Sequence, residues 1–149
     1  VAIGLMYNYY KSKEDLLIAI IYENLQRMFE NITLRLNQVP EAQHLSKMID
    51  LMIEVIIKEK SSWRLIISVM FQPDVSKIAS GRIHSVFNHQ EQLFESYYKD
   101  KGVNNPTESA KVLSAVLHGA ILQFACSENA DDLRLIQSTV VKKLLENGI

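Results

Sequence analysis

Apolar residues recur every three or four positions over a long stretch near the start of the chain, and this spacing constrains the fold most. The repeating residues are Leu17, Ile21, Leu25, Met28, Ile32 and Leu36. Residues three or four apart share one face of an α-helix, so the spacing predicts a single long helix from about Ser12 to Asn37. Pro40 is expected to end it, because proline disfavours helical geometry in the residue before it.

Later segments of the chain show the same periodicity. They predict helices at about 45–60, 63–71, 83–101, 106–126 and 131–147. Ser61 and Ser62 are expected to cap the 63–71 helix, and Pro73 to stop it, which leaves 73–80 as the longest irregular stretch.

Signals at the ends of the later helices are clearer. Gly102 suits the left-handed residue that follows a helix. Asn105 is expected to cap the next helix, with Pro106 at its first position. Asp131 and Asp132 are expected to open the last one, where their charge complements the helix dipole.

The fold class follows from these patterns. Apart from Gly119, the 5 glycines and 3 prolines fall between or at the edges of the periodic segments, and no segment alternates with the period of two that strands require. A chain of 149 residues suits one domain, or one domain with a fragment of another, and can bury a sizeable core. We therefore predict an all-α protein.

Composition and charge exclude several classes. The chain has 48% hydrophobic and 22% charged residues, which is typical of a globular protein rather than a disordered one. Its apolar runs are too short to span a bilayer, so no membrane partner is expected. A single cysteine excludes an intramolecular disulfide framework, and no secretory signal opens the chain, so a cytoplasmic location is expected. A formal net charge of −1 by itself argues against a nucleic-acid binder.

The first seventeen residues carry the most specific motif. A glycine is followed by three tyrosines and then by Ser12, which can cap the long helix by accepting from the amide near Asp15. This order resembles the end of the DNA-binding domain in the tetracycline-repressor (TetR) family of bacterial regulators. The residues in register are Val1, Gly4, Met6, Tyr7, Tyr9, Tyr10, Ser12, Lys13, Glu14, Leu16 and Leu17. Ala2 departs from the pattern, which usually has Ser or Thr there, and so one hydroxyl contact to the DNA backbone is lost.

Two further segments extend the resemblance over nearly the whole chain. The segment 63–73 is similar to a short helix in the middle of many family members, which also ends near Gln-Pro, and 117–124 is similar to their eighth helix. The resemblance implies that 1–11 is a remnant of a helix-turn-helix domain. It also implies that 12–149 is a ligand-binding and dimerisation domain, with 12–37 as the connecting helix.

The implied function is that of a ligand-responsive repressor that binds operator DNA as a homodimer. Ile3, Gly4 and Leu5 would face base edges, while Tyr7, Tyr9 and Lys13 would hold phosphates. In the family, most of the basic surface lies on two helices upstream of this motif. Because the chain also lacks an initiator Met, we expect it to be part of a longer protein, and only the longer protein to bind the operator.

A ligand cavity is expected between the helices spanning 45–60, 63–71, 83–101 and 106–124, which supply more apolar residues than one packed layer needs. The candidate lining residues are Met52, Ile56, Trp63, Ile67, Met70, Phe87, Phe94 and Gln123. This lining predicts a small apolar or aromatic effector, since a buried anion requires a nearby cation. Arg64 and Arg82 are the evident cations, and both are expected to be solvated.

The helix at 106–126 is apolar on more than one face, which a helix buried on one side does not need. Gly119 lies within it at a cost of about 1 kcal/mol relative to Ala, and close approach of a neighbouring helix would explain that cost. In the family, this helix and the last one pair with their symmetry mates in a four-helix bundle. The candidate interface residues are Val116, Gly119, Ala120, Gln123, Val140 and Leu144. A helix deep in a monomeric core would fit the same pattern.

No enzyme signature is present, and neither a cofactor nor a metal is expected. The four histidines are scattered, and His84 and His89 are five apart, which does not place both on one helical face. His118 is expected to be a core or interface residue, and Cys126 a small buried one. Two rival functions remain: a helical dimerisation or protein-interaction module without DNA or ligand, and a small-molecule-binding helical enzyme.

Overall fold

The structure is a computed structural model that describes residues 9–149, with only the backbone at 76, 78–80 and 82–84. The described residues are all-α and contain no strand, as the sequence predicts. The elements are α2 (Lys13–Leu36), η1 (Glu41–Gln43), α3 (His44–Lys58), α4 (Lys60–Met70), α5 (Pro73–Asp100), α6 (Pro106–Ser127), α7 (Ala130–Ile136), the π-helical η2 (Gln137–Val141) and α8 (Lys142–Asn147).

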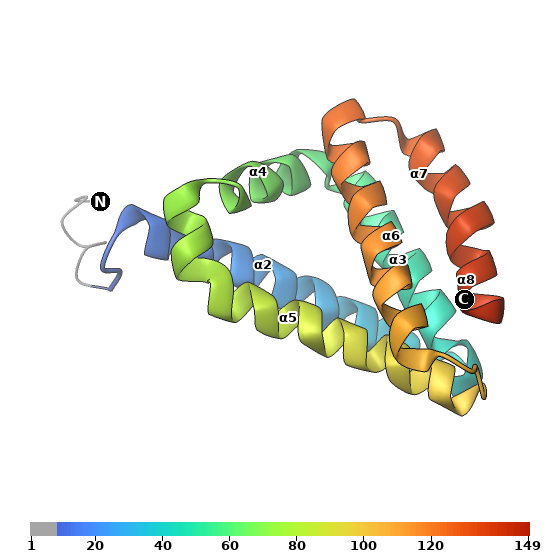
Figure 1. Cartoon of the computed structure of the whole chain (residues 1–149). Helices are drawn as coiled ribbons and strands as arrows, with labels where there is room; N and C mark the ends of the chain where they lie inside the picture. Colours follow the sequence, from blue (N-terminus) through green and yellow to red (C-terminus); the bar gives the residue numbers. More distant parts are fainter. Residues whose placement is uncertain (1–8) are drawn as a thin grey trace.

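Two long helices, α2 and α5, lie side by side and form the base of the molecule in Figure 1. Helix α6 rises from the carboxyl end of α5, and α7, η2 and α8 return alongside it, in front of α3. Helix α4 crosses from α3 to the amino end of α5 and also contacts α6. The chain therefore places helices from its first and last halves around one interior.

The ends of α2 agree with the sequence prediction. Ser12 has extended backbone angles, and its hydroxyl accepts a hydrogen bond from the Asp15 amide at 3.1 Å. Glu14 and Asp15 lie in the first turn, where negative charge is favourable. The helix ends at Leu36, before Pro40.

Two predicted boundaries were wrong. Helix α4 begins at Lys60, so Ser61 and Ser62 lie within the helix rather than capping it. Helix α5 begins at Pro73, so the expected irregular stretch at 73–80 is helical, and the helix continues through Gly81. Proline suits the first helical position because it has no amide hydrogen to leave unpaired there, and it can therefore start a helix as well as stop one.

The end of the chain also differs from the prediction. Asp131 and Asp132 lie in the first turn of α7 as predicted, but the cap is Asn129, whose side chain accepts from the amides of both. The predicted helix at 131–147 is interrupted by the π-helical turns of η2. The side chain of Asn105 makes no capping bond to α6, although Pro106 does start it. Gly102 has the predicted left-handed conformation, with φ +70°.

The apolar core has two parts. The larger one joins α2, α3, α5, α6, α7, η2 and α8 around Phe94 and Tyr98, whose side chains are fully buried. The smaller one joins α2, α4 and the start of α5, and its buried members are Ile18, Ile21, Ile66, Val69 and Val75. The two parts face each other across an unfilled space, which is the candidate site described below.

Helix α6 is the one helix of the described residues that is long and apolar enough to cross a membrane by length and composition. This was not predicted from the sequence, because the uninterrupted apolar runs of the chain are short. Half of its most apolar window is buried within the protein, and core helices of soluble proteins pass the same test, so this is weak evidence for a membrane segment.

Candidate ligand-binding cavity

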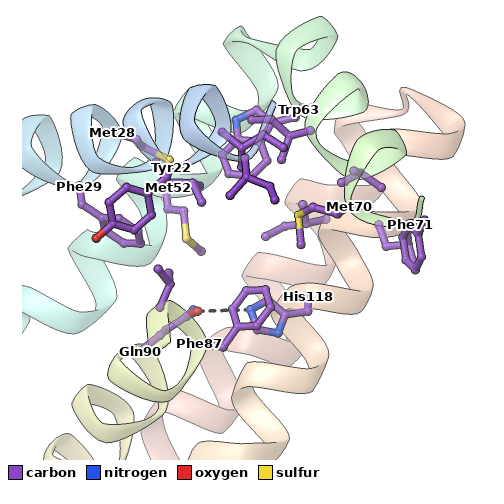
Figure 2. A pocket seen from close by; sticks show the side chains of 18 of the residues that line it. Tyr22, Met28, Phe29, Met52, Trp63, Met70, Phe71, Phe87, Gln90 and His118 are labelled. Carbon is purple, nitrogen blue, oxygen red and sulfur yellow. Dashed lines mark hydrogen bonds between the residues drawn. The ribbon is translucent and has the colours of Figure 1, made fainter. Parts of the chain in front are cut away.

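An apolar cavity of about 470 Å³ lies between the two parts of the core. Its walls come from α2, α3, α4, α5 and α6 (Figure 2). Small-molecule sites have volumes of about 300–1,000 Å³ and are lined mostly by apolar side chains with a few polar groups. The cavity has the size and the chemistry of such a site.

Helix α4 forms one wall of the cavity because its apolar residues recur at helical spacing. Trp63, Ile67 and Met70 lie on the face that lines the cavity, while the side chain of Leu65 is exposed. Figure 2 shows Trp63 and Met70 on the same side of the cavity, opposite Gln90. One amphipathic helix therefore covers the space without filling it.

The polar side chains of the cavity wall come from α2, α5 and α6. Gln90 is only 8% exposed, and its Oε1 lies 3.2 Å from Nε2 of His118. The ring of Phe87 lies against the His118 ring, with 4.6 Å between their centroids. Tyr22 of α2 adds a third polar side chain.

Burial lowers the pKa of His118 below its ordinary value of 6.5, and the nearby Glu91 offsets this effect in part. The imidazole is therefore neutral at pH 7, with one ring nitrogen as a donor and the other as an acceptor. Among the described residues that line the cavity, none is acidic, lysine or arginine.

Five of the eight candidate lining residues lie on the cavity wall: Met52, Trp63, Ile67, Met70 and Phe87. The other three do not. Ile56 and Phe94 are fully buried in the larger part of the core. Gln123 is exposed on another face of α6, in a groove between α6 and α7.

The contribution of α2 to the cavity was not predicted from the sequence. Its residues Tyr22, Leu25, Met28 and Phe29 line the cavity, although α2 was predicted only to connect two domains. The adjacent pair Met28-Phe29 widens its apolar stripe, and this was the available signal. His118 was predicted to be a core or interface residue, whereas its side chain reaches the cavity.

The candidate dimer residues divide into two groups. Ala120 is buried in the core of its own chain, and Val116 and Leu144 pack partly against that core. Gly119, Gln123 and Val140 are exposed. The same region also exposes the large apolar side chains of Leu122 and Leu135, beside a groove of about 570 Å³ between α6 and α7.

Two of the six predicted DNA-binding residues fall in the part of the chain that the structure describes. Ile3, Gly4, Leu5 and Tyr7 lie outside the described residues. Tyr9 and Lys13 are exposed at the amino end of α2.

Neither Arg64 nor Arg82 is among the described residues that line the cavity. Arg64 and Lys60 of α4 pair with Glu128, which follows α6. The pKa of Glu128 is lowered, chiefly by its hydrogen bond to Lys60. The side chain of Arg82 is outside the described set.

The structure also bears on the predictions about a metal site and about Cys126. The described residues contain no group of three or more His, Cys, Asp and Glu side chains that could hold a metal ion. Cys126 was predicted to be buried and is instead exposed, because it lies on the outer face of α6.

Comparisons of the chain with protein-family models, curated proteins and solved structures gave no match. The resemblance to the TetR family therefore depends on the sequence motifs described above.

Proposed function

We propose that this chain is the ligand-binding and dimerisation part of a TetR-like transcriptional repressor. The apolar cavity between the two parts of the core carries the proposal, because such a space costs packing energy and is unnecessary in a purely structural module. The amino-terminal motif supplies the link to DNA. A small apolar or aromatic ligand is the occupant that the wall chemistry favours.

The proposed mechanism uses α2 as the connection between ligand and DNA. A bound ligand touches Tyr22, Leu25 and Phe29 of α2, and the first turn of the same helix carries Lys13 next to the DNA-binding motif. A ligand that binds better to one position of α2 shifts the population toward that position. In a dimer, this changes the spacing of two recognition helices that must reach successive major grooves.

Dimerisation is proposed through the exposed face of α6, α7 and η2. Leu122, Leu135 and Val140 are exposed there, and burying large apolar side chains against a partner is favourable. This face alone would also suit the rival function, a helical interaction module without ligand or DNA.

Ligand binding separates the two functions. Trp63 is the only tryptophan and lies on the cavity wall, so its fluorescence reports on occupancy. We expect naphthalene to change Trp63 fluorescence saturably and to raise the melting temperature. A longer chain that includes a complete helix-turn-helix domain should bind a pseudo-palindromic operator. It should dissociate from that DNA when a ligand that occupies the cavity is added. If no compound in a panel of two- and three-ring aromatic compounds binds saturably, the rival function of a helical interaction module would be favoured.

A further inference from the structure

The pair formed by Gln90 and His118 holds a hydrogen-bond donor ready at the cavity wall. The Gln90 side chain is more than nine-tenths buried and reaches the cavity, where Figure 2 shows it beside His118 and Phe87. Its Oε1 accepts from Nε2 of His118 at 3.2 Å. An amide side chain has two N–H donors besides this acceptor. No described residue accepts from the Gln90 nitrogen, and this nitrogen is not among the fully buried atoms without a partner, as Ser114 Oγ is.

His118 fixes which end of the amide faces the ligand. A neutral imidazole that donates from Nε2 to Oε1 leaves the NH₂ group pointing away from the ring. Phe87 packs on the His118 ring at 4.6 Å and restricts its rotation. His118 is therefore a positioning residue, and Gln90 is the residue that would touch the ligand.

The rest of the wall determines what can accept this hydrogen bond. The described lining is otherwise almost entirely apolar, and it includes the aromatic side chains of Phe29, Trp63 and Phe87. A carboxylate would be buried without a cation, which is costly. A neutral carbonyl oxygen can accept the hydrogen bond at a much smaller cost of desolvation.

We propose that the cavity selects a neutral aromatic ligand with a carbonyl oxygen that accepts a hydrogen bond from the Gln90 side-chain amide, which His118 positions. This inference rests on the proposed function in that it requires the cavity to bind a ligand, and it adds the chemical class of that ligand. A hydrogen bond worth about 1.4 kcal/mol corresponds to about a tenfold difference in affinity.

The test compares two probes of nearly the same shape. 2-Acetylnaphthalene has a carbonyl oxygen where 2-isopropenylnaphthalene has a methylene group. Dissociation constants are measured by equilibrium dialysis, and Trp63 fluorescence places the probe in the cavity. The ketone should bind about tenfold more tightly than the alkene, and 2-naphthoate should bind more weakly than either.

Two variants test the assigned roles. Gln90→Met keeps the length of the side chain without a donor, so the ketone should lose about tenfold in affinity while the alkene is unchanged. His118→Leu should lower the ketone-to-alkene preference without weakening the alkene, whereas structural damage would weaken both. Gln123→Met is the matched control, because Gln123 is exposed on another face of α6 and should keep the preference.

Each remaining outcome decides a different point. Equal binding of ketone and alkene by the unmodified protein overturns the inference but does not contradict the proposed ligand-binding function. This comparison uses only the unmodified protein, so its result does not depend on whether a variant folds. Tight binding of 2-naphthoate overturns the selection of neutral ligands. Binding of no probe contradicts both the inference and the ligand-binding part of the proposed function.

Discussion

Tyr98 shows how a single polar atom can anchor the end of a helical chain. Its ring is fully buried, and its hydroxyl donates to the Leu144 carbonyl of α8 at 2.7 Å. Burial raises the pKa of Tyr98 to about 12, so the hydroxyl keeps its proton at all physiological pH values. The neighbouring Tyr97 makes a longer bond of 3.3 Å to the Leu145 carbonyl.

We predict that Tyr98→Phe lowers the free energy of unfolding by about 0.5–1.5 kcal/mol, because it removes this hydrogen bond while keeping the buried ring. Urea unfolding monitored by circular dichroism measures the change. Tyr97→Phe is the matched control and should cost less, since its bond is longer and its side chain is half-buried. A larger cost at Tyr97 would contradict the assignment of Tyr98 as the anchor.

His118 predicts how stability depends on pH. Its pKa is lowered in the folded protein from the ordinary value of 6.5, mainly by burial. Just below 6.5 the unfolded chain therefore binds more protons than the folded one, and the free energy of unfolding falls as pH falls through this window. Glu95 and Glu128 also have a lowered pKa, but from 4.5, so their contribution is lost at lower pH.

We predict that His118→Gln flattens the pH dependence between about pH 7 and pH 5, because the variant cannot take up this proton. Chemical unfolding at several pH values gives the slope. His89→Gln on the exposed surface of α5 is the control and should leave the slope unchanged. An unchanged slope in the His118 variant would show that this side chain is not the source.

At the scale of the elements, apolar periodicity predicted the existence of the helices well and their ends less well. The helix at 12–37 was confirmed as Lys13–Leu36, since a cap, charges and a long stripe all agree there. Pro73 was ambiguous, because the same residue ends one helix and starts another. The π-helical turns at Gln137–Val141 have no signal in the periodicity.

The site was predictable only in part, for a physical reason. Periodicity assigns a residue to a face of its helix, but not to the neighbour which that face meets. Met52 lines the cavity while Ile56, one turn later, is in the filled core. Likewise, Gln123 and His118 belong to the same helix but face different spaces. These differences depend on where two cores fail to meet, which no local pattern encodes.

Gly119 gives a prediction for α6. A Cβ placed there would meet no atom of the described structure within 4 Å, so close packing within the chain does not explain the glycine. We predict that Gly119→Ala raises the free energy of unfolding of the monomer by about 0.5–1 kcal/mol, because alanine favours the helix. Thermal and urea unfolding at low protein concentration measure it. A loss of stability would show an unrecognised clash at this position.

At the scale of the whole molecule, the α4 wall of the cavity is connected to other helices at both of its ends. Glu128 has a left-handed conformation, with φ 57°, and forms ion pairs with both Lys60 and Arg64. These contacts fix the start of α4 to the turn after α6, while the other end of α4 leads directly into α5 at Pro73. The helix that carries Trp63 is therefore connected to neighbouring helices at both of its ends.

The last prediction concerns assembly, which the proposed repressor requires. Leu135 is 60% exposed on α7, beside Leu122 and the groove between α6 and α7. Stable interfaces bury about 1,200–2,000 Å² in total, and a charge at their centre is left without water. We expect the chain to be a dimer at micromolar concentration in sedimentation experiments. Leu135→Glu should convert it to a monomer with little change in the free energy of unfolding.

Leu34→Glu is the control, because Leu34 is 69% exposed on α2, away from this face, and this variant should remain dimeric. Loss of the dimer in both variants would indicate a general effect of charge, and a monomeric unmodified chain would contradict both the interface and the proposed mechanism.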